Sequence, residues 1–214
     1  IALAGLMPSV WLVLLFLISP ILVIMPLIAN AFFLIEIFAT TLILGVVALS
    51  LMFLAGYGGM VSLIQHPEQM KALQDDTGKI ANAVEEILRM ESPSAGMWRV
   101  VKKDSEFHGV KIPKDSLVML RYHAANRDRQ LFDDPNDIHI DRDNADDHIA
   151  FGQGIHFCPG AMLARKEMNV AFEALLSRLD NIRLVEEKSD LSYWPNIVLR
   201  GLKELHIRFD KRSA

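Results

Sequence analysis

The amino-acid sequence predicts a mainly α-helical protein with small β-sheets, preceded by two apolar helices. Of the 22 Lys and Arg and 26 Asp and Glu residues in the 214-residue chain, only Glu36 precedes residue 67. In the charged part, apolar residues recur at helical spacing. Short strand-like segments separated by turn residues indicate small sheets there. We therefore divide the chain into an apolar segment, residues 1–57, and a second domain, residues 58–214.

The apolar segment contains two uncharged runs, Leu6–Leu27 and Ala39–Tyr57. Each run is long enough to cross a lipid bilayer as an α-helix. We expect residues 1–57 to span a membrane twice, with two deeply buried helices of a soluble protein as the alternative. Glu36 lies between the runs and would mark a turn at the membrane surface, or alternatively an ion or proton site within the membrane.

A segment that spans a membrane twice leaves both of its ends on one side. We expect a membrane-associated protein whose second domain lies in the cytoplasm, or a cytoplasmic protein if residues 1–57 are foreign to the gene. Because the chain starts with Ile1 rather than Met, we also expect a fragment or a processed chain.

Composition excludes further classes of protein. The formal net charge is -4 and the sequence has no stripe rich in Lys and Arg, so no nucleic-acid partner is expected. The single cysteine, Cys158, excludes an internal disulfide and a metal site of paired cysteines. Cys158 is therefore either a buried apolar thiol or a functional one.

Three helical regions are expected in the second domain. Residues 58–72 hold the end of one helix and the start of the next, with a break at His66-Pro67. Residues 79–90 form an amphipathic helix that ends before Ser92-Pro93. The apolar stripe of this helix consists of Ile80, Val84, Ile87 and Leu88. A third helix is expected from about residue 160 to residue 179.

Strand signals lie between these helices and after them. Residues 97–101 predict a strand, and residues 110–112 and 117–121 predict the two arms of a hairpin, with Pro113–Ser116 as its turn. Residues 126–147 predict a long irregular loop, which in a compact domain indicates a functional or firmly held segment. Residues 191–209 predict one or two strands.

The residues with the clearest chemistry follow the long loop. Residues 151–160 have the form F-x-x-G-x-x-x-C-x-G, with Phe151, Gly154, Cys158 and Gly160 at the fixed positions. A cysteine thiolate can ligate haem iron and increase its electron density. Cys158 lies where a helix starts, with Pro159 expected at the first helical position, and the helix dipole and free N–H groups there favour a negative sulfur. The two glycines would let the loop run close to a flat macrocycle, and Phe151 would pack over it.

This pattern resembles the cysteine loop of the cytochrome P-450 family, the haem-thiolate monooxygenases. Two further features occur in the order that the family shows. Glu86 and Arg89 resemble its E-x-x-R motif, three residues apart on one helical face. Arg142 resembles the arginine that completes an ion network with this pair. An exposed surface pair is the alternative for Glu86 and Arg89. The resemblance covers residues 58–209.

The resemblance implies the C-terminal part of the cytochrome P-450 fold with haem b as cofactor. Cys158 would be the axial ligand of the iron, and Arg99 and His156 would donate hydrogen bonds to the haem propionates. A solvated strand residue is the alternative for Arg99, and a loop histidine bonded to the backbone is the alternative for His156. The remaining histidines outside the motif have no metal-ligand spacing, and we expect surface or structural roles for His66, His108, His123, His139 and His206.

The function implied by the resemblance is a monooxygenase that inserts one oxygen atom from O₂ into a small apolar organic substrate. A ferredoxin or a reductase would supply the electrons. The acid and threonine with which the family activates oxygen are not found upstream, so no catalytic residue is assigned. Asp115 also departs from the glycine usual in the family. The alternatives are a non-catalytic, truncated or fused fragment that binds haem and is anchored to a membrane, and a fragment of a membrane transporter.

Overall fold

The computed structural model describes residues 58–212 and five isolated upstream positions, Pro20, Ile24, Asn30, Phe32 and Thr40. The chain divides into two compact units, residues 1–47 and residues 48–214, and the description that follows concerns the second. Apart from those five positions, the two predicted membrane spans and Glu36 lie outside the described residues. The boundary expected at residue 57 stays a prediction. No helix formed by the described residues has the length and apolar character needed to cross a membrane.

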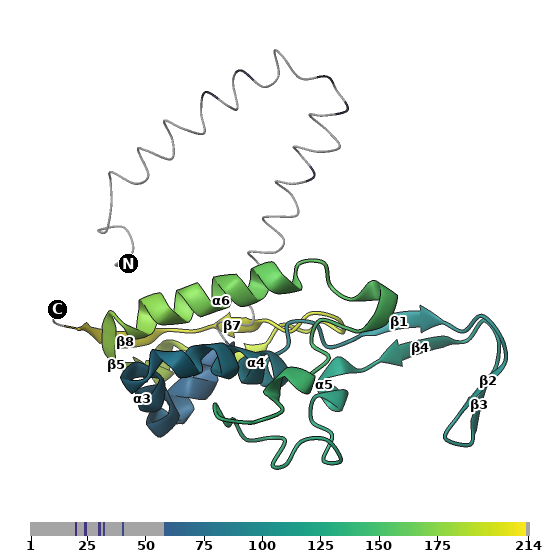
Figure 1. The fold of residues 1–214 in the computed structure, drawn as a ribbon, viewed down its shortest axis with the longest axis horizontal. Coiled ribbons are helices and arrows are strands. Elements are labelled where there is room, and N and C mark those ends of the chain that lie inside the picture. The colour runs from purple at the N-terminus through teal and green to yellow at the C-terminus, as the bar shows by residue number, and fades with distance from the viewer. Residues whose placement is uncertain are drawn as a thin grey trace. The chain divides into compact units, whose positions relative to one another are not determined.

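The helices follow the predicted order (Figure 1). Residues 58–65 are helical, and α3 (Pro67–Asp75) begins directly after the break at His66, with Pro67 in its first turn where its missing N–H costs nothing. A 3₁₀ turn, η3 (Thr77–Lys79), leads into α4 (Ile80–Met90). After the short α5 (Tyr122–Ala125), α6 (Ala161–Leu176) ends three residues before the predicted position. The cause is strand β5, which begins at Leu179.

The strands form antiparallel pairs within residues 58–212. The pairs are β1 (Met97–Val100) with β4 (Leu117–Leu120), β2 (Ser105–Phe107) with β3 (Val110–Ile112), β5 (Leu179–Leu184) with β8 (Ile207–Lys211), and β6 (Asp190–Tyr193) with β7 (Leu202–Glu204). Figure 1 shows β2 and β3 at the far end of the ribbon formed by β1 and β4. The tail therefore contains three strands, β6, β7 and β8, rather than the one or two expected.

The predicted hairpin between residues 110–112 and 117–121 is wrong. Both strands exist, but β3 pairs with β2 and β4 pairs with β1. The turn between β2 and β3 is His108-Gly109, whose φ angles are 48° and 78°. Two positive φ values in a two-residue loop match the right-handed twist of the strands that the loop joins. Strand β2 is short and largely polar in sequence, and it was not anticipated.

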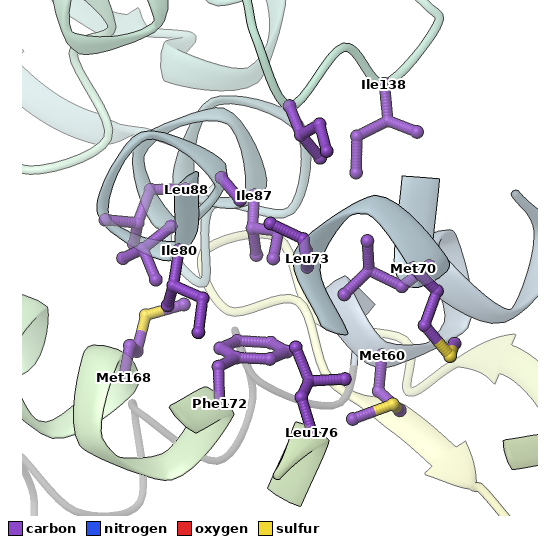
Figure 2. Packing of buried hydrophobic residues seen from close by; sticks show 14 of the residues in the cluster. Met60, Met70, Leu73, Ile80, Ile87, Leu88, Ile138, Met168, Phe172 and Leu176 are labelled. Atoms are coloured by element: carbon purple, nitrogen blue, oxygen red, sulfur yellow. The ribbon is translucent and has the colours of Figure 1, made fainter. Parts of the chain in front are cut away.

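The core of this unit is built around α4 (Figure 2). Ile80, Ile87 and Leu88 are almost completely buried. Figure 2 shows Phe172 and Leu176 of α6 reaching toward α4 and α3, with Ile138 of the long loop on another side. Burial of each such side chain stabilises the fold by roughly 1.5–3 kcal/mol. The core therefore joins helices with a segment that has no regular structure of its own.

Candidate functional site

The long irregular loop is held to α4 by buried ion pairs. Of the loop predicted over residues 126–147, residues 126–144 form no helix or strand, whereas its end forms a 3₁₀ turn, η4 (Ala145–Asp147). Arg89 donates to both carboxylate oxygens of Glu86, with Nε–Oε2 and Nη2–Oε1 distances of 2.7 and 2.8 Å. Arg142 Nε lies 3.1 Å from each of these oxygens. The Glu86 and Arg89 side chains are 0% exposed, so the alternative of an exposed surface pair is wrong.

The same two arginines also bind the backbone of the loop. Arg89 Nη1 donates to the carbonyls of Asn126 and Pro135 at 2.8 Å, and Arg142 Nη1 donates to that of Asp133 at 2.6 Å. Burial opposes ionisation of Glu86, but the hydrogen bond from Arg89 and the neighbouring cations lower the pKa of its carboxyl below the usual value. These contacts stand in for the hydrogen bonds that regular structure would have provided to the loop.

Cys158 lies in a short backbone loop ahead of α6. Its N–H donates to the carbonyl of Phe151 at 3.0 Å, and its own carbonyl accepts from Ala161 N at 3.2 Å. Between them, the 3₁₀ turn η5 (Gly154–His156) is closed by Phe157 N donating to Gly154 O at 3.0 Å. Gly154 has a φ of 73°, and its α-carbon faces open space. Cys158 is a half-buried free thiol.

The start of α6 differs slightly from the prediction. The N-cap is Gly160 and the first helical residue is Ala161, so Pro159 precedes the helix instead of occupying its first position. The reason is a turn over residues 158–161, closed by the bond between Ala161 N and Cys158 O. Cys158 thus lies two residues before the N-cap, still close to the free N–H groups of the first helical turn.

A second ion network holds the cysteine loop to α4 and α6. On α6, Arg165 donates from Nε and Nη2 to the two carboxylate oxygens of Glu85 at 2.8 and 2.9 Å. The Arg165 guanidinium carbon lies 4.7 Å from the centre of the Phe151 ring. His148 Nε2 lies 3.2 Å from Glu85 Oε2. Burial opposes ionisation of Glu85, but hydrogen bonds to His148 and Arg165 hold the pKa of this carboxyl at about 2.

This second network was missed in the sequence, although α6 carries a signal for it. Arg165 falls on the same helical face as the buried residues Ala161, Met168 and Phe172. A cation on an apolar stripe needs a buried partner. The partner could not be identified because Glu85 lies 80 positions earlier in the chain.

Arg99 and His156 lie on different elements. Arg99 is half-buried on β1, and its Nη1 donates to the carbonyl of Trp98 at 2.8 Å. His156 is exposed in η5. Within residues 58–212, neither side chain forms an ion pair with a carboxylate, and no hydrogen bond joins either one to Cys158. In that part of the chain His156 also makes no side-chain bond to the backbone, which argues against the alternative role for it.

His123 has a structural position, in agreement with the expectation. It is buried on α5, with Nε2 bonded to Ser92 O at 2.8 Å and Nδ1 accepting from Arg127 at 3.0 Å. Burial lowers the pKa of its imidazole to about 4, and nearby arginines act in the same direction. The imidazole is therefore neutral at physiological pH and links α5 to the residues that follow α4.

Comparison with known proteins identifies the family. The cytochrome P-450 family profile matches residues 80–203, more than half of the chain. This chain belongs to the cytochrome P-450 family. It is 39% identical over 167 residues to 6-deoxyerythronolide B hydroxylase of Saccharopolyspora erythraea and 41% identical over 152 residues to the PikC monooxygenase of Streptomyces venezuelae. These alignments cover 74% and 71% of this chain.

Solved structures agree with the assignment. A cytochrome P-450 from Chondromyces apiculatus matches with a TM-score of 0.71 and 39% identity, covering 76% of this chain and 42% of its own. The two relatives named above are covered over 41% and 36% of their length. The chain thus spans about two-fifths of the length of these three cytochrome P-450 proteins.

The residues around Cys158 fit the haem iron of the cytochrome P-450 family. Cys158 is a half-buried free thiol, a group that can serve as a sulfur ligand. Arg99 and His156 carry hydrogen-bond donors that no carboxylate of residues 58–212 occupies. Apolar side chains beside the thiol in sequence are exposed, and they include Ile155, Phe157, Met162 and Leu163. Apolar surface of this kind indicates a face that receives another group.

Proposed function

We propose that this chain provides the proximal, sulfur-donating part of a haem-thiolate monooxygenase. Such an enzyme inserts one oxygen atom from O₂ into a small apolar organic substrate, with electrons from a ferredoxin or a reductase. The observation that carries the proposal is the half-buried thiol of Cys158, held by backbone hydrogen bonds in a loop with an open, apolar outer face. Sequence identity of 39% to 6-deoxyerythronolide B hydroxylase supports the reaction class.

The proposed cofactor is haem b, which when bound supplies the iron centre at which O₂ is reduced. The sulfur of Cys158 would hold the iron. Gly154 and Gly160 would leave room for the flat ring, since neither has a side chain. Phe151 would cover the loop on its inner side, where its ring lies against Arg165. Arg99 and His156 would hold the propionates through charge-assisted hydrogen bonds.

The residues of this chain would act on the sulfur rather than on oxygen. The N–H of Cys158 is already bonded to Phe151 O, which fixes the backbone on which the thiolate stands. Free N–H groups at the start of α6 favour negative charge nearby. Phe157, 49% exposed, would exclude water from one side of the sulfur once the cofactor covers it. No acid and threonine for proton delivery are assigned to the chain.

A non-catalytic haem-binding fragment is the second candidate. The observation in its favour is the coverage of only about two-fifths of the length of the matched relatives. The groups that cover the other face of the haem would then have to come from elsewhere. Substrate turnover with a supplied electron donor separates this candidate from the first, because both predict haem binding and only the first predicts oxygen insertion.

We propose in addition that residues 1–57 attach the protein to a membrane, with the second domain on the cytoplasmic side. The uncharged runs Leu6–Leu27 and Ala39–Tyr57 support this proposal by their length and composition. Alkaline extraction of membranes from cells that express the full chain tests it. Retention in the pellet until detergent is added is the expected result, and release without detergent would contradict it.

The sulfur ligand is tested by reduced, CO-bound absorption spectra of the full chain loaded with haem b. Thiolate ligation gives a strongly red-shifted band, which is the expected result for the unchanged protein. Cys158→Ala should lose this band. The control is Lys166→Ala, at an exposed position on α6, the helix that follows Cys158, and this variant should keep the band. Haem uptake without the red-shifted band in the unchanged protein would overturn the proposal.

A further inference from the structure

Arg165 occupies an unusual position for a cation. It lies on the buried face of α6 with Ala161 and Met168, and its side chain is only 24% exposed. The guanidinium contacts two partners. One partner is the carboxylate of Glu85 on α4, bound through two parallel hydrogen bonds. The other is the ring of Phe151, at 4.7 Å. Paired N–H donors fix the plane of the guanidinium, and the plane then limits where the ring can lie.

Phe151 connects this ion pair to the cysteine. Its carbonyl accepts the N–H of Cys158 at 3.0 Å, so the two ends of the loop are paired at that point. Its ring is also near two other rings, those of His148 at 6.0 Å and Phe157 at 6.4 Å. Arg165, His148 and Phe157 therefore enclose the residue that bonds to Cys158.

Glu85 joins two of these three neighbours. Its Oε1 accepts from Arg165 Nε, and its Oε2 lies within hydrogen-bonding distance of both Arg165 Nη2 and His148 Nε2. His148 Nδ1 in turn accepts from Ala150 N at 3.1 Å, directly before Phe151. The Glu85 carboxylate on α4 thus has two roles. Through His148 it holds the chain just before the loop, and through Arg165 it holds the Phe151 ring.

We propose that Arg165, oriented by Glu85, is a positioning residue for the sulfur of Cys158. It acts through Phe151 and touches neither the sulfur nor the substrate. By fixing the Phe151 backbone, it fixes the hydrogen bond that sets the position of Cys158 and so favours the ligated thiolate over a displaced thiol. This inference depends on the function proposed above, because it assigns the purpose of the network to haem ligation.

The test compares Arg165→Met with Lys166→Met in the full chain loaded with haem b. Both changes remove one cation from α6 and insert the same side chain, but Lys166 is exposed and makes no hydrogen bond within residues 58–212. Residues that support a metal ligand contribute ~10–100-fold to metal affinity. We expect Arg165→Met to weaken haem binding about tenfold and to convert much of the red-shifted CO band to a band at shorter wavelength. Lys166→Met should match the unchanged protein in both measurements.

Arg165→Lys separates positioning from simple loss of charge. Lysine keeps the cation but cannot make the paired bonds to Glu85 or hold a fixed plane over Phe151. We expect a ratio of the two CO bands between those of the unchanged protein and Arg165→Met. A purely structural role would lower the melting temperature and total haem content while leaving this ratio as in the unchanged protein, and that result would overturn the inference.

A cofactor-free measurement keeps the inference testable if Arg165→Met binds no haem. Alkylation of the single cysteine reports how firmly the loop holds it. We expect Cys158 to react several-fold faster in Arg165→Met than in Lys166→Met because local opening exposes it. Equal rates would contradict the inference. Absence of the red-shifted band in the unchanged protein would instead refute the proposed function, so the two failures are distinguishable.

Discussion

Two adjacent residues on α4, Glu85 and Glu86, hold two regions that differ in how far their polar groups and apolar side chains are paired and buried within this chain. Glu86 holds residues 126–147, which we call the pinned loop. Glu85 holds residues 151–160, which we call the cysteine loop, indirectly, through Arg165 and its contact with the Phe151 ring. In the pinned loop, the arginines and backbone carbonyls satisfy one another and Phe132 is 1% exposed. In the cysteine loop, Ile155 is 97% exposed and the thiol is free. The charged side chains that hold the first region are paired within this chain, although the buried Asn126 Nδ2 has no hydrogen-bond partner among the described residues. The second region presents a free thiol and an exposed apolar face to another group.

This difference separates stability from ligand binding. Removal of a partner from a closed, buried network leaves a charge or a polar group unsatisfied, which is costly. A change on an open face leaves little unsatisfied because water already reaches it. We therefore expect substitutions in the pinned loop to unfold the protein and substitutions in the cysteine loop to affect haem uptake.

The largest effect is expected for Glu86→Gln. The change leaves Arg89 and Arg142 buried without a counter-charge, and breaking such a network typically costs ~3–5 kcal/mol. Urea unfolding of the full chain measures the loss. Asp75→Asn is the control, because its pair with Lys71 is exposed and worth at most about 0.5 kcal/mol. An average substitution lowers the free energy of unfolding by ~1 kcal/mol. If Glu86→Gln lowers it by no more than that, the pinned loop is held by other contacts.

A matched pair of phenylalanines gives the next largest contrast. Phe132 of the pinned loop is buried beneath the Arg89 guanidinium, 5.0 Å from its ring centre, and Phe132→Ala should cost ~3–5 kcal/mol. Phe157 of the cysteine loop is 49% exposed, and Phe157→Ala should cost under about 1 kcal/mol in the absence of haem. With haem bound, we expect Phe157→Ala to lower the melting temperature more than it does without haem. Equal losses for the two variants without haem would remove the distinction between the regions.

Acidification should remove the stabilising contributions of His123 and Glu85 in two successive pH ranges. His123, bonded to Arg127 of the pinned loop, has its pKa lowered to about 4. Its imidazole therefore takes up a proton more readily in the unfolded chain than in the folded one. Its contribution is complete above pH 6.5 and is lost as the pH falls from 6.5 toward 4. Glu85, with its pKa lowered to about 2, contributes fully above pH 4.5 and loses that contribution between pH 4.5 and 2.

Each loss amounts to at most roughly 3.4 kcal/mol by proton linkage. Urea unfolding as a function of pH measures it. His123→Gln should flatten the change in stability between pH 6.5 and 4 while leaving the lower range intact. Glu85→Gln should leave the upper range intact and reduce, without abolishing, the change below pH 4.5, where Glu86 also loses its contribution. If the free energy of unfolding of His123→Gln still falls as steeply between pH 6.5 and 4 as that of the unchanged protein, a group other than His123 titrates in that range.

The smallest effect is expected for Ile155→Ser. At 97% exposure, Ile155 loses almost no buried surface, and the free energy of unfolding should change by less than about 0.5 kcal/mol. Haem affinity should fall if this face receives the cofactor, and a haem titration followed by absorbance detects the change. An unchanged affinity would show that Ile155 lies outside the haem contact.

The sequence alone determined those features that depend on neighbouring residues. The apolar stripe of α4, the break at His66-Pro67 and the irregular course of residues 126–144 follow from spacing and backbone chemistry, and the structure confirms them. The ten-residue pattern around Cys158 was also readable, because its fixed positions are close together. The resemblance built on that pattern led to the family that the comparisons establish.

Tertiary structure alone decided which distant segments meet. The strands predicted at residues 110–112 and 117–121 exist, the second ending one residue earlier, at Leu120. Their partners were not recognised, because a short strand can pair with any edge that the rest of the fold presents. Arg165 was overlooked, although its spacing already puts a cation on the apolar stripe of α6, and its carboxylate partner is one of many acids in the chain. Burial selected Glu85 from among them, since a charge removed from water is stable only where the packed helices bring an opposite charge into contact.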